Sequence, residues 1–164
     1  MIGLQLPDLK TATAHIFTRP SLDYFLLKEA IIVTSNTYTI DGTVKKDYFS
    51  EEELEGLRDP EWMEWKLLRP VCFSLIKGSR LPLSFQIALA LSRDNIDRLV
   101  GQNRISFRTE EIGGLYLNFR YEKKVLTAIS ATSLKTFSMD KSLEILWDDT
   151  VKKLLHQLEI PFEE

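Results

Sequence analysis

The last third of the chain constrains the fold most, because two alternating segments there are followed by a long amphipathic helix. Residues 115–121 and 125–132 alternate their apolar side chains with a period of two, a pattern typical of the strands of a β-hairpin. A helical pattern then begins at Asp140 and places its apolar residues on one stripe: Leu143, Trp147, Val151, Leu154 and Leu158. This succession predicts an α+β domain in which a long C-terminal helix packs on a sheet.

The predicted hairpin turns at Lys123-Lys124, where no glycine or asparagine supplies the positive φ that a tight turn favours. Placing Glu122 opposite Val125 decides which side chains share a face. One face then holds Leu117, Phe119, Tyr121, Leu126, Ala128 and Ser130, and the other holds Asn118, Arg120, Thr127 and Ile129. We expect the first of these faces to be part of the core.

Two earlier segments also predict strands. Residues 85–91 alternate most regularly, and their second face is conspicuously small, with Ser84, Gln86, Ala88 and Ala90. Residues 25–33 are rich in β-branched and aromatic side chains, and the strand pattern continues over residues 37–40. Asp41-Gly42 has the residues of a tight turn, so we expect a return strand over residues 44–49.

Capping signals predict the helices. Asp59-Pro60 is typical of a helix start, and the helix that follows would carry Trp62, Trp65 and Leu68 on one side. Pro70 either bends this helix or begins a second one. Further short helices are expected after Asp8, Ser50 and Ser92. The whole pattern indicates antiparallel hairpins with helices packed mainly on one face of the sheet.

A chain of 164 residues has the usual size of one domain, so we expect residues 1–164 to form a single α+β domain. The single cysteine, Cys72, cannot form an internal disulfide, and the residues from Met1 to Leu4 lack the pattern of a secretory signal. No apolar run approaches the roughly 20 residues of a membrane span. These features favour a cytoplasmic protein without a membrane partner.

The net charge of −3 disfavours a general nucleic-acid-binding protein, because phosphate contacts need clustered basic residues. The basic residues nevertheless concentrate in the middle of the chain. Residues 58–108 hold nine basic and five acidic residues, a local charge of +4, whereas both flanking segments are acidic. A solvated surface with scattered arginines accounts for this excess, and so does a surface that faces an anion.

Three stretches carry a family resemblance: Phe25–Ala30 with Thr39–Gly42, Leu68–Gly78, and Thr132–Phe137. They resemble an uncharacterised protein family of anaerobic Gram-positive bacteria, a domain of unknown function. The resemblance covers most of the chain and implies a cytoplasmic, single-domain bacterial protein. It implies no activity and carries over no functional residue.

Motifs for cofactor and metal chemistry are absent. The seven glycines form neither a phosphate-binding loop nor a dinucleotide fingerprint, and no nucleophile elbow is present. His15 and His156, with one cysteine, offer no metal-ligand spacing, and we interpret both as surface or boundary histidines. We therefore expect no cofactor and no metal. Cys72 lies among apolar neighbours and is expected to pack as a small apolar group.

Three polar features need an explanation. Glu29 lies between Leu27 and Ile31 on one strand face, where a buried acid would be costly unless a bulge or a basic partner intervenes. Lys77 and Arg80 follow the helix that contains Cys72, where the helix dipole also favours a cation. Lys135 lies between the last strand and the last helix, a position at which an ordinary solvated lysine is also expected.

The sequence leaves the function unknown, and we favour a non-catalytic binding or interaction protein whose partner is an anionic small molecule or another protein. The alternative is an enzyme acting on an anionic or phosphorylated small molecule, with Glu29 or Asp41 as general base and with these anion ligands: Arg69, Lys77, Arg80 and Lys135. A third possibility is weak RNA binding through the arginine-rich middle segment. An enzyme needs acid, base and cations in one concave pocket, whereas an RNA surface is open and has exposed aromatic rings.

Overall fold

The structure, a computed structural model that describes residues 1–164, is built on one six-stranded antiparallel sheet. The strands lie in the order β1-β6-β5-β4-β2-β3. Their bounds are β1 Gly3–Gln5, β2 Leu26–Val33, β3 Thr37–Asp41, β4 Ser84–Ala90, β5 Ile112–Glu122 and β6 Val125–Leu134. The predicted α+β class, with antiparallel hairpins and a long C-terminal helix, is confirmed.

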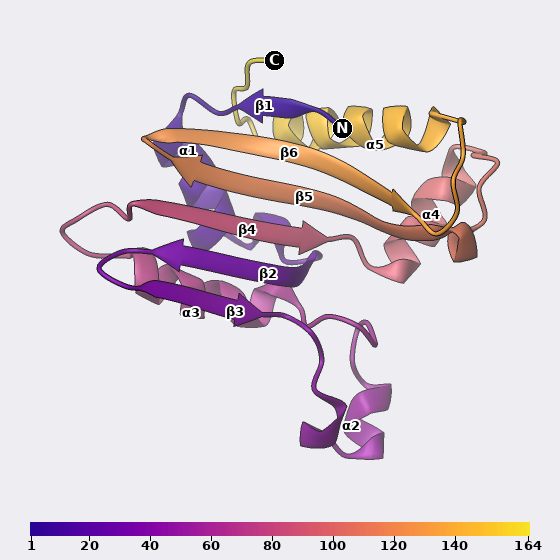
Figure 1. The fold of residues 1–164 in the computed structure, drawn as a ribbon, viewed down its shortest axis with the longest axis horizontal. Helices are drawn as coiled ribbons and strands as arrows, with labels where there is room; N and C mark the ends of the chain where they lie inside the picture. The colour runs from indigo at the N-terminus through magenta and orange to yellow at the C-terminus, as the bar shows by residue number, and fades with distance from the viewer.

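The helices that pack on the sheet share one face, as the sequence predicts. In Figure 1 they lie behind the strands: α1 (Leu9–Thr13), which continues as the π-helical turn η1 (Ala14–Thr18), α3 (Trp65–Ile76) and α5 (Ser142–Gln157). Helix α4 (Arg93–Gln102) lies at the end of the sheet that β4 leads into, and the short α2 (Glu51–Glu55) lies away from the strands, below β3. None of these helices combines the length and the apolar composition that a bilayer crossing requires.

The core lies between this layer of helices and the sheet. The predicted core faces of β4, β5 and β6 are buried in it, and the register of the last hairpin is the expected one, with Glu122 opposite Val125. Lys123 and Lys124 both adopt the positive φ of a tight turn. Helix α5 buries Leu143, Trp147, Val151 and also Leu155, a fully buried residue that the predicted stripe omitted in favour of the half-buried Leu154.

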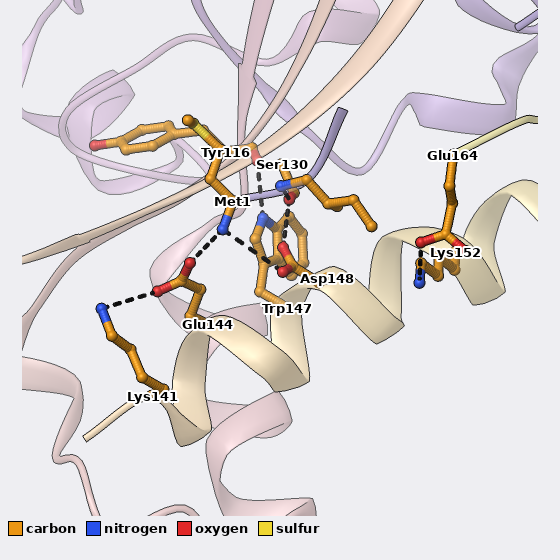
Figure 2. Close-up of polar contacts among 10 residues, drawn as sticks. Met1, Tyr116, Ser130, Lys141, Glu144, Trp147, Asp148, Lys152 and Glu164 are labelled. Carbon is orange, nitrogen blue, oxygen red and sulfur yellow. Dashed lines mark hydrogen bonds and ion pairs between the residues drawn. The ribbon is translucent and has the colours of Figure 1, made fainter. Parts of the chain in front are cut away.

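Polar contacts fasten α5 to the sheet edge that β6 and β1 form (Figure 2). The Trp147 indole donates a hydrogen bond of 2.8 Å to the main-chain oxygen of Tyr116 in β5. Ser130 of β6 bonds to the Asp148 carboxylate and accepts a 3.0 Å bond from the main-chain N–H of Ile2. The Met1 nitrogen forms ion pairs with Glu144 and Asp148. These contacts give hydrogen-bond or ion-pair partners to Glu144, Trp147 and Asp148 of the closing helix.

The first hairpin differs from the prediction. Strand β2 turns at residues 34–36 and pairs with β3, so Asp41-Gly42 ends a strand instead of making the turn. Residues 44–49 form no return strand; they contain only a 3₁₀ turn, and the neighbouring Thr43 forms a single bridge with Trp62. Gly42 is required for another reason, because a Cβ there would lie 1.7 Å from the main-chain oxygen of Leu27. Gly42 is needed where two backbones approach closely, and from the sequence alone such a glycine cannot be told from a glycine in a turn.

The helix expected at Asp59 begins later, at Trp65. Asp59 is buried and caps other backbone: it accepts hydrogen bonds from the N–H groups of Glu61 at 2.9 Å and Arg93 at 3.3 Å. One helix then runs through Pro70 without a break between elements. Trp62 and Trp65 do not share a helix face, because Trp62 precedes the helix and forms a bridge with Thr43, and the next residues pair with the start of β2. Trp65 is fully buried in the core, and Trp62 lies on the opposite face of the sheet.

Candidate functional site

The sheet face turned toward the viewer in Figure 1 carries no helix. Its side chains form rows across the strands, because directly paired residues point the same way. One row runs from β6 to β3 through Ile129, Asn118, Ala88, Glu29 and Asp41. The next row contains Thr127, Arg120 and Gln86. This face is therefore a mixed polar surface over the central strands of the sheet.

A hollow of about 690 Å³, here called the open-face hollow, lies on this surface. Small side chains at Ala88 and Ala131 leave space above the central strands, which explains the small second face in the sequence of β4. Trp62 and Tyr116 stand beside them, together with Lys28. The volume falls within the range of small-molecule sites.

Trp62, Tyr116 and Lys28 form an aromatic corner of the open-face hollow. The two rings meet edge to face with their centroids 6.1 Å apart, and the Lys28 ammonium lies 4.6 Å from the centre of the Tyr116 ring. Gly114 makes room for the phenol, because a Cβ there would lie 2.3 Å from the Tyr116 hydroxyl. Burial, and then the nearby charge of Glu61, raises the pKa of Tyr116. The phenol is therefore a neutral hydrogen-bonding group at physiological pH.

Several polar side chains of the open-face hollow have no partner within the protein. The amides of Gln86 and Asn118 and the carboxylate of Glu29 make no hydrogen bond or ion pair with another side chain or with the backbone. Arg120, in contrast, pairs with Glu122 at 2.9 Å. Asp41 accepts bonds from the N–H of Thr43 and from Lys45, and the Thr43 bonds and then Lys45 lower its pKa to about 2. Donors and acceptors thus remain free around the floor of the hollow.

Glu29, a possible buried acid by its place in the strand pattern, has an exposed side chain. The register of β2 against β4 shifts between Leu27 and Glu29, so the strand has a β-bulge there and Lys28 is the extra residue. The bulge turns both Lys28 and Glu29 toward the open face. A bulge, one of the two explanations expected for a carboxylate at this position, is therefore present. Glu29 also lies directly opposite Asp41 across the β2–β3 pair.

The four expected anion ligands do not form one site. Arg69, on the helix side of the sheet, is held by a two-pronged pair with Asp23 (2.9 and 3.2 Å) and by the main-chain oxygen of Phe17. Lys77 and Arg80 are exposed in the connection that leads into Ser84, the start of β4. Lys135 follows β6 at the opposite end of the sheet. The last residues of β6 pair with the first residues of β5, whereas the first residues of β4 pair with the last residues of β5. Glu29 and Asp41 are separated from Arg69 by the sheet itself.

The sequence pattern does not indicate the aromatic corner. The cap signal at Asp59-Pro60 predicts that Trp62 shares a helix face with Trp65, and Tyr116 belongs to a strand whose pattern is dominated by its core residues. One signal did point to the site: the face of β4 with Ser84, Gln86, Ala88 and Ala90 is too small and too polar to need a covering layer. The pairing of Asn118 and Arg120 with Ile129 and Thr127, expected from the hairpin register, is confirmed.

Other potentially reactive groups lie outside this surface. Cys72 is buried, and desolvation raises its pKa to about 12, so it carries no thiolate at neutral pH. His15 is buried instead of lying at the surface or boundary; its Nδ1 contacts Ser21 Oγ at 2.6 Å and its Nε2 contacts Arg19 at 3.2 Å. No group of three His, Cys, Asp or Glu side chains has the arrangement of a metal site.

The comparisons with known proteins address the family and leave the activity open. No curated protein and no solved structure matches the chain significantly. A family model described as a family of unknown function (DUF5721) matches residues 15–163. That range contains the strands β2 to β6, the helices α2 to α5 and every residue of the open-face hollow. The chain therefore belongs to this family of unknown function, as its resemblance to an uncharacterised family implied.

Proposed function

We propose that the protein is a non-catalytic, cytoplasmic binding protein of bacteria, and that the open-face hollow is its binding site. One observation carries the proposal: unpaired Gln86, Asn118 and Glu29 surround a floor of small residues beside two aromatic rings. Amides without partners are not needed for packing, and on a sheet face they are free to recognise a ligand.

The chemistry of the hollow favours a neutral, flat ligand with several hydrogen-bonding groups. Trp62 and Tyr116 offer ring surfaces against which a planar or apolar face can stack. The two amides supply donors and acceptors, and the Glu29 carboxylate accepts only. Cations (Lys28, Arg120) and anions (Glu29, Asp41) are balanced among the lining residues, so the site does not select a strongly charged ligand.

The two alternative functions receive less support from this geometry. Catalysis with Glu29 or Asp41 as base requires the anion ligands beside them, and Arg69 lies on the other side of the sheet. The low pKa of Asp41 also makes it a weak base. RNA binding fits the open face and its aromatic rings, but two carboxylates next to those rings repel a phosphate backbone.

Tryptophan fluorescence tests the proposal, because Trp65 and Trp147 are buried and Trp62 alone among the tryptophans is partly exposed. We would titrate the protein with nucleobases, nucleosides, monosaccharides and disaccharides. A ligand of the open-face hollow is expected to change the emission of the wild type but not of Trp62→Phe. Loss of one neutral hydrogen bond in Gln86→Ala or Asn118→Ala should weaken its binding by about three- to tenfold.

Gln5→Ala is the matched control, because Gln5 lies on the same face, next to Thr127 on the edge strand β1, and outside the hollow. Its binding should equal that of the wild type. Equal weakening by Gln5→Ala and Gln86→Ala, or no response to any of these compounds, would contradict the proposal.

A further inference from the structure

A second hollow, of about 360 Å³, lies between α4 and α5 on the helix side of the molecule. Helix α4 contributes Asn95, Arg98, Leu99 and Gln102, which recur at the spacing of one helix face. Helix α5 contributes Trp147, Thr150, Val151 and Leu154 with the same spacing. Two helix faces therefore line this space, here called the α4–α5 hollow, from both sides.

The charged side chains of the α4–α5 hollow are all basic. Arg58 and Arg98 line it, and no aspartate or glutamate does, in contrast to the mixed charges of the open-face hollow. Arg98 donates one bond, of 3.2 Å, to the Asn95 amide oxygen and forms no ion pair. Arg58 contacts Glu64 only at 3.8 Å, near the limit of an ion pair. Because each guanidinium has five N–H donors, most donors of this pair remain free.

Two further polar groups reach the same space. The Tyr24 hydroxyl makes no hydrogen bond within the protein, and burial raises its pKa to about 12, so it stays a donor. The Gln102 amide also has no partner. The floor, in contrast, is apolar and consists of Phe25, Leu91, Trp147 and Val151, all buried. The hollow thus combines an apolar base with a rim of donors.

We propose that the α4–α5 hollow binds a small organic anion, a carboxylate or phosphate group attached to an apolar ring or chain. The charged group lies between Arg58 and Arg98, where bidentate contacts with a guanidinium are available. The apolar body lies on Trp147 and its neighbours. This site is separate from the open-face hollow and does not depend on the function proposed for it. It draws on the basic middle of the chain, but through Arg58 and Arg98 instead of Arg69, Lys77 and Arg80.

Calorimetric titration with four probes tests the proposal: benzoate, phenyl phosphate, benzyl alcohol and inorganic phosphate. At least one of the first two should bind, and benzyl alcohol, which keeps the ring and lacks the charge, should bind at least about tenfold more weakly. Inorganic phosphate should also bind more weakly than phenyl phosphate. Which of the two anions binds more tightly distinguishes a carboxylate from a phosphate ligand.

Variants locate the site. Arg58→Gln and Arg98→Gln should each weaken anion binding by about tenfold or more, since both side chains are exposed and their loss leaves the fold intact. Gln102→Glu places a carboxylate in the hollow and should abolish binding. Arg80→Gln removes the same charge from an exposed arginine outside the hollow and is the matched control. Trp62→Phe should leave anion binding unchanged, which separates this test from that of the open-face hollow.

Four results would overturn the proposal. Neither anion binds the wild type; benzyl alcohol binds as tightly as the tighter of the two anions; inorganic phosphate binds as tightly as that anion; or Arg80→Gln weakens binding as much as Arg98→Gln does. A circular dichroism spectrum equal to that of the wild type would show, for each variant, that the loss of binding is not caused by a loss of the fold.

Discussion

The two faces of the sheet are formed by the same strands, but one face is buried under helices and the other is open. On the helix side, Phe85, Ile87 and Leu89 of β4 are at most 2% exposed and pack in one continuous core. On the other side, the alternate residues Gln86 and Ala88 line the open-face hollow. Packing explains every large side chain on the first face, and it explains neither the free amides nor the aromatic corner of the second. The continuous core therefore lies on one face of the sheet, and the proposed ligand site of the open-face hollow lies on the other.

The largest loss of stability is expected from a substitution on the covered face. Trp147→Ala removes a buried indole of α5 together with its hydrogen bond to the Tyr116 main chain, so the free energy of unfolding should fall by about 3 to 5 kcal/mol. Urea denaturation measures this loss. A loss below about 1 kcal/mol would show that α5 is not part of the cooperative core.

The second largest effect is expected at Gly42, whose backbone lies against that of Leu27 at the β2 bulge. A Cβ in Gly42→Ala would overlap the main-chain oxygen of Leu27 at the β2 bulge, and the strand must shift, at a cost of about 1 to 3 kcal/mol. The same shift should move Lys28 and Glu29 and weaken binding in the open-face hollow. Gly101→Ala in α4 is the control, because a Cβ at that position would meet open space. The stability of this variant should not fall. Equal stability of the two variants would contradict the close approach at Gly42.

A pH effect near neutrality is expected from His15, on the covered side of the sheet. Burial, and then the positive charge of Arg19, lowers the pKa of His15 below its usual 6.5. Well above pH 6.5 the imidazole is neutral in both the folded and the unfolded chain. As the pH falls, the unfolded chain takes up the proton first, so stability is lost on the acid side. Melting between pH 7.5 and 5 should show this decline in the wild type and in His156→Gln, and a flatter curve in His15→Gln. Parallel curves for all three proteins would contradict the assignment.

The smallest expected effect has the opposite sign and belongs to the open face. Glu29 and Asp41 lie directly opposite each other, and like charges in such a pair destabilise a sheet. Glu29→Gln should therefore raise the urea midpoint slightly while it weakens ligand binding in the open-face hollow. This is the behaviour expected of a functional position that is not optimised for stability. A lowered midpoint would mean that Glu29 stabilises the fold instead.

The sequence predicted the covered face well and the open face only in part. Core alternation in β4 and β5 and the stripe of α5 are periodic signals, and the register of the last hairpin followed from a two-residue turn. Asp41-Gly42 was misread because a glycine at a close backbone contact looks like a glycine in a turn. Trp62 was misplaced because Asp59-Pro60 resembles a helix cap. The open-face hollow depends on these two irregular segments, and long-range backbone contacts leave no local pattern.

An amide chemical-shift map, recorded on labelled protein with the tightest neutral ligand from the fluorescence titration, tests directly whether the open face of the sheet binds a ligand. If the ligand binds in the open-face hollow, the shifts should be confined to the Trp62 indole and to the strands beneath the hollow, at Gln86, Ala88, Tyr116 and Asn118. Amides of α1, α3 and α5 on the covered face should stay unchanged. Shifts centred on those helices, with β4 and β5 unaffected, would contradict the assignment of binding to the open face of the sheet.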